Sequence, residues 1–133
     1  MKIVSQAFLA MIGRVFSGHV VVRGDSMLPT LRPGDYLMVN HLAYVASAPQ
    51  KGDVVVVKGR TGAPARQIKR VADLPGEPEL PGAEVYVLGD NPDGSTDSRD
   101  YGPVARSSIE GKAWLRYWPP GRFGLIGGRL QKR

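Results

Sequence analysis

The amino-acid sequence predicts a mainly β fold, a small folded β-sheet or barrel that follows a short N-terminal helix. Three observations predict it. The chain has 133 residues, the size of one domain. Its 17 glycines and 11 prolines separate short apolar runs, a pattern typical of many strands and turns. Several of these runs are β-branched, such as the four valines at 54–57.

The first 18 residues predict an amphipathic helix. Its apolar residues recur at helical spacing, at Val4, Phe8, Met11, Ile12 and Val15. Polar residues interrupt the run, which falls short of the roughly 20 apolar residues needed to cross a bilayer. We expect this helix either to lie on a membrane surface or to pack on its own domain. A cleavable secretory signal is the alternative, although no A-x-A-like cleavage site follows.

The remaining residues, 19–133, form the second predicted region. β-branched or alternating apolar patterns predict strands over 19–22, 36–39, 54–57, 66–71, 84–88 and 109–117, the last strand of the chain. Turns rich in glycine and proline separate them. A long polar loop over 89–102 is of the kind that compact domains keep for function, or leave disordered.

Composition excludes several classes of site. The chain has no cysteine, so disulfides, thiolate nucleophiles and thiolate zinc sites are ruled out. The net charge of +6 suits an anionic membrane surface, a nucleic acid or an acidic partner, or it serves only solubility. The basic residues are scattered, which argues against nucleic-acid binding. When Gly94 of the acidic loop is aligned with the required EF-hand glycine, Gly89 falls where the first Asp should be, which argues against a calcium site.

Ser26 is the candidate nucleophile. It follows a predicted strand, and Gly24 and Pro29 break regular structure on either side. A serine hydroxyl needs a neighbouring base to react at neutral pH. Counting alone leaves a Ser-His-Asp triad open, because His19 and His41 are available. Neither histidine lies in a turn with a nearby carboxylate, so we expect both to have surface roles.

Lys69 is the better candidate base. Apolar neighbours, Ile68 and Val71, flank it on a predicted strand. Burial there would disfavour the ammonium and lower the pKa of the amine. A neutral lysine can accept the serine proton. The competing interpretation is an exposed strand lysine paired with an acid.

These segments, in order, resemble the conserved boxes of the signal peptidase I family. The nucleophile box corresponds to residues 24–31, a structural box to 51–55, the general-base box to 67–77 and the last box to 89–104. Each box is moderately specific alone, and four in the right order are very specific. The resemblance implies the mainly β fold of the signal peptidase and LexA-like type, with residues 19–133 as the serine–lysine peptidase domain.

The resemblance also implies residue roles. Ser26 would attack the scissile carbonyl and form an acyl-enzyme, with its backbone N–H as an oxyanion donor. Lys69 would act as general base, and Ser95 would orient its amine. Asp97 and Arg99 would form an ion-pair scaffold for the last loop, which Arg70 could join. The implied substrate is the extended signal or leader peptide of a precursor protein, with small residues before the cut. The resemblance implies no metal and no cofactor.

Three features depart from many family members. Gly24 stands where some members carry a serine as second oxyanion donor. The N-terminal anchor is weak, and the connection over 77–85 is short. The last two features, with the ending over 114–119, are similar to compact mitochondrial inner-membrane enzymes. They are equally similar to bacterial proteases that trim the propeptide of nickel superoxide dismutase.

Three functions therefore stay open, and the intact Ser26, Lys69 and Ser95 argue against a fourth, a catalytically dead peptide-binding module. The first is a signal peptidase at a membrane, with its catalytic domain on the extracytoplasmic side. The second is a dedicated maturation protease for one soluble precursor, which would be cytoplasmic. The third is a LexA-like self-cleaving regulatory domain, for which the N-terminal part is too short to hold a helix-turn-helix.

Overall fold

The structure is a computed structural model and describes residues 6, 18–59, 66–74, 76 and 84–127. The N-terminal helix predicted for residues 1–18 lies almost wholly outside them. Gln6 is helical, and Gly18 is already the first residue of a strand. Within the described part of the chain, no helix has the length and apolar character to span a bilayer.

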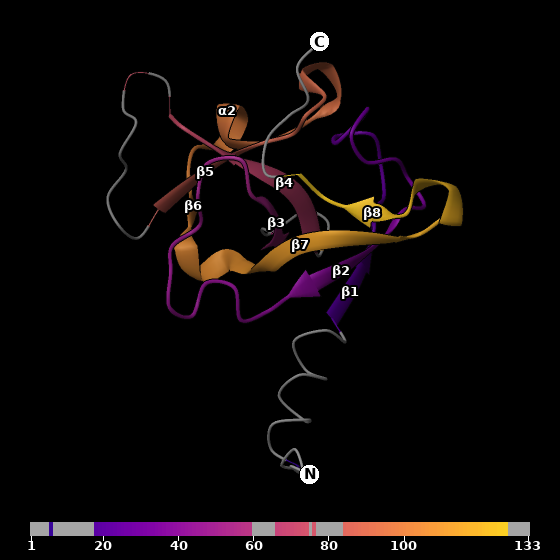
Figure 1. Cartoon of the computed structure of the whole chain (residues 1–133). Coiled ribbons are helices and arrows are strands. Elements are labelled where there is room, and N and C mark those ends of the chain that lie inside the picture. The colour runs from indigo at the N-terminus through magenta and orange to yellow at the C-terminus, as the bar shows by residue number, and fades with distance from the viewer. Residues whose placement is uncertain (1–5, 7–17, 60–65, 75, 77–83, 128–133) are drawn as a thin grey trace.

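The described residues form a mainly β fold, as the sequence predicts (Figure 1). The strands are β1 (Gly18–Val21), β2 (Tyr36–Asn40), β3 (Val54–Lys58), β4 (Arg66–Ala72), β5 (Glu84–Leu88), β6 (Val104–Ala105), β7 (Ile109–Trp118) and β8 (Gly124–Leu125). They pair in the order β1-β2-β7-β3-β4-β5-β6, with β8 beside β7. All of these pairings are antiparallel.

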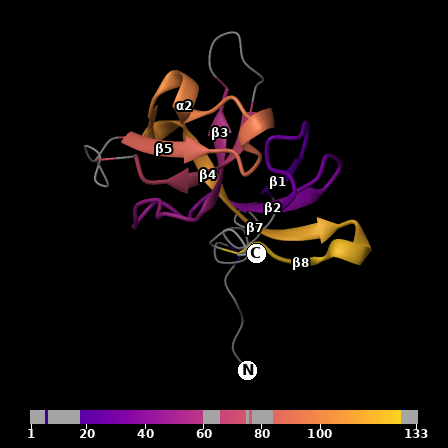
Figure 2. The same cartoon turned by 90° about the horizontal axis from the view of Figure 1, so that it is seen from above.

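The long strand β7 joins two halves of the sheet. It pairs with β2 on one side and with β3 on the other. It therefore links the β1–β2 half to the β3–β4–β5 half, and Figure 2 shows these halves on either side of it. This arrangement lets β1 and β4, which are far apart in the pairing order, border the same groove.

Strand β3 contributes to both hydrophobic cores. Its four valines, 54–57, are all buried, which explains why the run is apolar without alternation. Val54 packs in the core beneath the segment of the candidate nucleophile, which also contains Met27 and Leu31. Val55 and Val57 pack in the second core, against β5 and β6. The sheet is thus anchored on both faces directly beside the candidate site.

Short elements were missed by the sequence prediction. β7 is not the last strand, because the two-residue β8 follows it, and β6 is equally short. Two-residue strands carry no periodic signal, and pairing across the sheet alone defines them. The loop over 89–102 contains a 3-10 helix, Pro92–Gly94, and a short helix α2, Ser98–Tyr101. Two further 3-10 helices lie at Arg106–Ser108 and Pro120–Arg122.

Candidate active site

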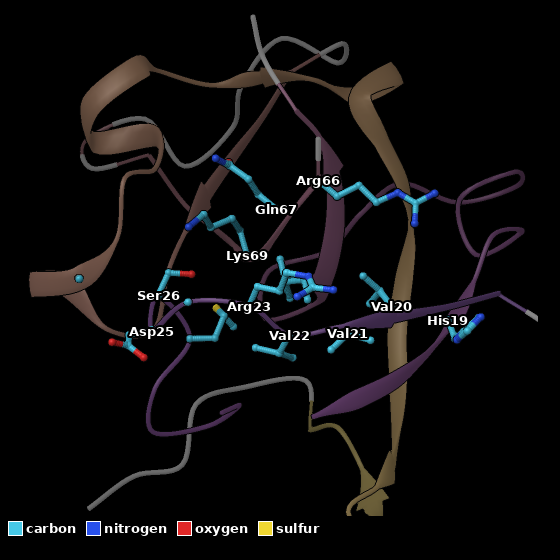
Figure 3. A pocket seen from close by; sticks show the side chains of 14 residues that line it. His19, Val20, Val21, Val22, Arg23, Asp25, Ser26, Arg66, Gln67 and Lys69 are labelled. Carbon is cyan, nitrogen blue, oxygen red and sulfur yellow. The ribbon is translucent and has the colours of Figure 1, made fainter. Parts of the chain in front are cut away.

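A groove of about 700 Å³ contains the main candidate residues. One wall consists of residues 19–27, the other of the first half of β4, residues 66–69, and Gly94 also lines it. Ser26 and Lys69 lie toward one end of the groove, and His19 lies toward the other (Figure 3). The structure therefore brings together two residues that are 43 positions apart in the sequence.

Both walls of this groove have backbone groups available for pairing. β1 is the terminal strand of the pairing order and pairs only with β2 among the described strands. β4 pairs with β3 along residues 66–70, whereas β5 pairs with it only from Arg70 onward. Residues 66–69 therefore keep one edge without a described neighbouring strand. Two such edges can accept an extended peptide by adding strand pairing.

The segment that carries Ser26 is a loop closed at its base. Val22 donates its N–H to the Asp35 carbonyl oxygen at 2.8 Å, and Gly34 donates to the Val22 carbonyl oxygen at 2.8 Å. Gly24 has a φ of 74°, a left-handed conformation that favours glycine, and this bends the chain just before Ser26. Buried Met27 anchors the other side of Ser26 in the core. The half-buried serine thus lies on a well-braced turn.

The buried carboxylate of Asp35 stabilises the base of the same loop. Asp35 is 0% exposed and forms ion pairs with both Arg116 and Arg122. Arg116 Nη1 also donates to the Thr30 carbonyl oxygen at 2.9 Å. Because an unpaired buried charge is strongly unfavourable, these arginines hold the base of the loop against β7 and the Pro120–Arg122 turn.

Lys69 is almost fully buried, with 3% of its surface exposed. Its Nζ donates to Ser95 Oγ at 3.2 Å, and Ser95 Oγ donates in turn to Asp97 Oδ2 at 2.7 Å. Burial lowers the pKa of Lys69 below its usual value, although the Asp97 carboxylate opposes this effect. The neutral form of the Lys69 amine is therefore more populated near neutral pH than that of an exposed lysine. The sequence-based expectation of a buried lysine agrees with this position.

Asp97 is the centre of the network behind Lys69. It is 0% exposed and accepts hydrogen bonds from Ser95, from the Gly89 N–H at 2.8 Å and from Arg99 Nε and Nη2, both at 2.9 Å. Burial alone would raise the pKa of Asp97, but Arg99 and the other donors hold it well below its ordinary range. Asp97 also caps α2 through a capping box with Asp100. The carboxylate stays ionised and fixes the loop around Ser95.

Arg70, on β4, forms an ion pair with Asp90 of the 89–102 loop, a partner that the sequence analysis did not identify. Its Nε and Nη2 contact the two carboxylate oxygens of Asp90, each at 2.9 Å. Nη1 of Arg70 donates to the carbonyl oxygens of Gly52 at 2.9 Å and Gly127 at 3.3 Å. Arg70 therefore connects the last loop to a turn and to the C-terminal segment.

The 89–102 loop, called the last loop after the last motif box, also contacts the nucleophile segment, residues 22–31, directly. The Asn91 N–H donates to the Ser26 carbonyl oxygen at 2.9 Å. A Cβ atom at Gly89 would lie 2.6 Å from that same oxygen and 2.2 Å from Ser95 Oγ, so only glycine fits there without a shift. The loop thus brings Ser95 and the nucleophile segment into one tightly packed unit.

Comparison with known proteins gives the family. The family model described as signal peptidase, peptidase S26, matches residues 1–79 and 77–118. The chain belongs to this family. It is 39% identical to mitochondrial ATP-independent inner membrane protease subunit 1a of Arabidopsis thaliana, over 79% of this chain and 73% of that protein.

Two further relatives support the assignment. Mitochondrial inner membrane protease subunit 1 of Xenopus tropicalis is 36% identical, over 87% of this chain and 81% of that protein. Signal peptidase I of Leptolyngbya laminosa is 31% identical, over 80% of this chain and 71% of that protein. The match to both names agrees with the resemblance inferred from the sequence motifs, and it supports a serine-type peptidase.

The two histidines of this signal peptidase family member have partners away from Ser26. His19 Nδ1 lies 3.2 Å from the Tyr117 hydroxyl, at the far end of the groove. His41 Nδ1 lies 3.2 Å from the Glu110 carbonyl oxygen. Neither contact forms a triad with Ser26. In the part of the chain that the structure describes, no three His, Asp or Glu side chains gather as a metal-binding set.

Gly89, Asp90 and Asn91 lie at the start of the last box, residues 89–104, but the sequence alone assigned them no roles. Each now has a specific contact, with the Asp97 carboxylate, the Arg70 guanidinium and the nucleophile segment respectively. The signal that could have found them is the motif itself, because adjacent Gly, Asp and Asn at the start of a functional loop suit tight turns and buried pairing.

Proposed function

We propose that this chain is a serine endopeptidase that removes N-terminal signal or leader peptides, with Ser26 as nucleophile and Lys69 as general base. The observation that carries the proposal is the burial of Lys69, with its lowered pKa, in the groove that Ser26 also lines. A lysine amine without its proton is a competent base, and a buried lysine beside a serine is the arrangement that such catalysis requires.

In the proposed acylation step, neutral Lys69 takes the proton of the Ser26 hydroxyl as Oγ attacks the scissile carbonyl carbon. The tetrahedral intermediate then expels the amine of the mature protein, which receives that proton from Lys69. Ser95 supports this role because its hydroxyl hydrogen is engaged by Asp97, leaving its oxygen to accept from the lysine amine. That contact orients an N–H toward Ser95 and leaves the nitrogen lone pair for Ser26.

In the proposed deacylation step, Lys69 takes a proton from a water molecule that attacks the acyl-enzyme ester. The ester bond breaks, and the proton returns to Ser26 Oγ. The backbone N–H of Ser26 would stabilise the negative oxygen in both steps. Gly24 offers no side-chain donor, so the orientation of this one N–H becomes especially important.

The proposed substrate is an extended peptide that lies between β1 and the first half of β4. The two edges support it, because strand pairing binds a backbone whatever its side chains are. Small residues before the cut follow from the family resemblance. The half-buried Val20 and Val21 line the groove and present apolar surface to such residues.

A membrane location is part of the proposal. Two of the relatives are named inner membrane proteases, and a signal peptide substrate is itself apolar. We infer that the chain acts at a membrane surface, with its catalytic domain on the extracytoplasmic side and without binding nucleic acid. The basic net charge of +6 favours contact with anionic lipid.

Mass spectrometry of cleavage products tests the proposal. The full chain is incubated with a signal-peptide-bearing precursor and with a soluble propeptide-bearing precursor, with and without anionic lipid vesicles. We expect cleavage of the first precursor after small residues, stimulated by vesicles and absent in Ser26→Ala and Lys69→Arg. Guanidinium cannot serve as a base near neutral pH, so activity in Lys69→Arg would refute the dyad. Preference for the soluble precursor, without lipid dependence, would instead indicate a dedicated maturation protease.

A further inference from the structure

The side chain of Asn91 contacts the nucleophile segment at a second point. Its Nδ2 donates to the carbonyl oxygen of Asp25 at 3.0 Å, while its backbone N–H donates to the carbonyl oxygen of Ser26. A carbonyl oxygen only accepts, so the amide nitrogen of the carboxamide has to face it. One residue of the 89–102 loop therefore contacts two successive peptide units around Ser26, and at the Asp25 carbonyl it adds to a hydrogen bond from the Leu28 N–H at 3.1 Å.

The first of these peptide units is the important one. The carbonyl of Asp25 and the N–H of Ser26 belong to the same planar group, so fixing the carbonyl fixes the direction of the N–H. We propose that Asn91 is a positioning residue of the oxyanion site, which orients and polarises the N–H of Ser26 through the carbonyl of Asp25. This inference rests on the proposed function, because it assigns a role in stabilising the same tetrahedral intermediate.

Polarisation adds to orientation. A hydrogen bond accepted by a peptide carbonyl makes the N–H of the same peptide a stronger donor, since successive hydrogen bonds reinforce one another. The contribution matters most when charge develops on the substrate oxygen, and little when the neutral substrate binds. Asn91 should therefore affect the rate of acylation and leave substrate affinity unchanged.

Gly94 provides an independent way to move the carboxamide. A Cβ atom built on Gly94 would lie 2.7 Å from Asn91 Nδ2, closer than real Cβ contacts allow. The backbone of Gly94 has no positive φ, so alanine fits it without strain. Gly94→Ala should thus displace the end of a flexible side chain and leave Ser26, Lys69 and the loop backbone in place.

The experiment compares Asn91→Asp, Asn91→Ala and Gly94→Ala with the wild-type chain on a precursor peptide. Asn91→Asp keeps the shape and the backbone N–H but places an acceptor opposite the Asp25 carbonyl. We expect kcat to fall by about tenfold or more in each, a smaller loss than the hundredfold or greater effect of removing an oxyanion donor itself. KM should stay unchanged in the two Asn91 variants, which carry this comparison because Gly94 itself lines the groove. A peptide boronate, which forms a tetrahedral adduct on a serine, should lose affinity by the same factor as kcat/KM.

Asp93→Ala is the matched control. Asp93 is exposed and lies in the same 3-10 helix as Gly94, so this variant should keep the wild-type kcat and KM. Wild-type kcat in Asn91→Asp or in Gly94→Ala would overturn the inference, as would a rise in KM alone in Asn91→Asp. These results would leave the proposed function standing. Full activity of Ser26→Ala on the same peptide would instead refute the proposed function, and the inference with it.

Discussion

Arg70 and Asp90 form a two-point ion pair, with side chains that are only 9% and 4% exposed. The guanidinium lies on β4, directly after Lys69, and the carboxylate lies in the loop that also carries Ser95. This pair fixes the distance between the strand and the loop. The position of the lysine amine relative to Ser95 therefore depends on it.

Breaking this pair should strongly destabilise the protein. We expect Asp90→Asn to lower the free energy of unfolding by about 3–5 kcal/mol, because it leaves the Arg70 charge buried without a charged partner. Urea denaturation of the two proteins at neutral pH measures the difference.

The control for this prediction is the exposed pair Lys51–Asp73, with side chains 72% and 45% exposed. Asp73→Asn should change the free energy of unfolding by less than about 1 kcal/mol, as is usual for surface ion pairs. Equal effects of the two substitutions would contradict the structural role assigned to Arg70 and Asp90.

Sequence reasoning predicted much of the fold, and it named two residues, Ser26 and Lys69, that the structure places in one groove. The four valines of β3 and the apolar neighbours of Lys69 are local patterns, and local patterns predict strands and buried positions. The residues that hold the site were harder to assign. Arg70 and Asp90 are 20 positions apart, and Asn91 and Asp25 are 66 apart. Contacts between residues so far apart in the sequence are determined by strand order and loop placement, and local sequence patterns do not predict these.

The pH dependence of cleavage should report the environment of Lys69. Because burial lowers the pKa of this amine, kcat/KM should rise with pH through an apparent pKa below 10.5, as the neutral base forms. The Arg99 cation contributes to the lowering, so Arg99→Gln should move this rise to higher pH. Initial rates across a pH series measure the shift. A rise that moves to lower pH in Arg99→Gln would contradict the electrostatic account.

Asp97 should link stability to acid. Its pKa in the folded protein lies below the unfolded value of about 3.9, so the unfolded chain binds more protons as the pH falls below that value. The stability that this carboxylate contributes is present above about pH 4 and declines below it, by up to about 1.4 kcal/mol per pH unit. Urea denaturation at pH 3 and pH 7 should show a smaller loss in Asp97→Asn than in the wild-type chain.

An equal loss of stability in the wild-type chain and in Asp97→Asn would assign the acid sensitivity to other carboxylates.

At pH 7 we expect Asp97→Ala to reduce the free energy of unfolding more than it reduces catalytic activity, since the carboxylate contacts Ser95, Gly89 and Arg99. A variant of wild-type stability that has no activity would contradict this expectation.

Gly89 should be intolerant of a side chain because two parts of the site meet on it. A Cβ atom there would lie 2.2 Å from Ser95 Oγ and 2.6 Å from the Ser26 carbonyl oxygen, and the second contact is with backbone that cannot turn aside. We expect Gly89→Ala to lower the free energy of unfolding by about 1–3 kcal/mol, as overpacking does, and to lower kcat as Ser95 moves from Lys69.

Gly121→Ala is the matched control, because no atom of the described residues outside its chain neighbours lies within 4 Å of its added Cβ. It should change neither the free energy of unfolding nor kcat. Kinetics and urea denaturation on the same two variants separate the effects. If Gly89→Ala lost stability but kept wild-type kcat, the loop could yield without moving Ser95. The contact between Ser95 and Lys69 would then not depend on the close approach of Gly89 to the nucleophile segment.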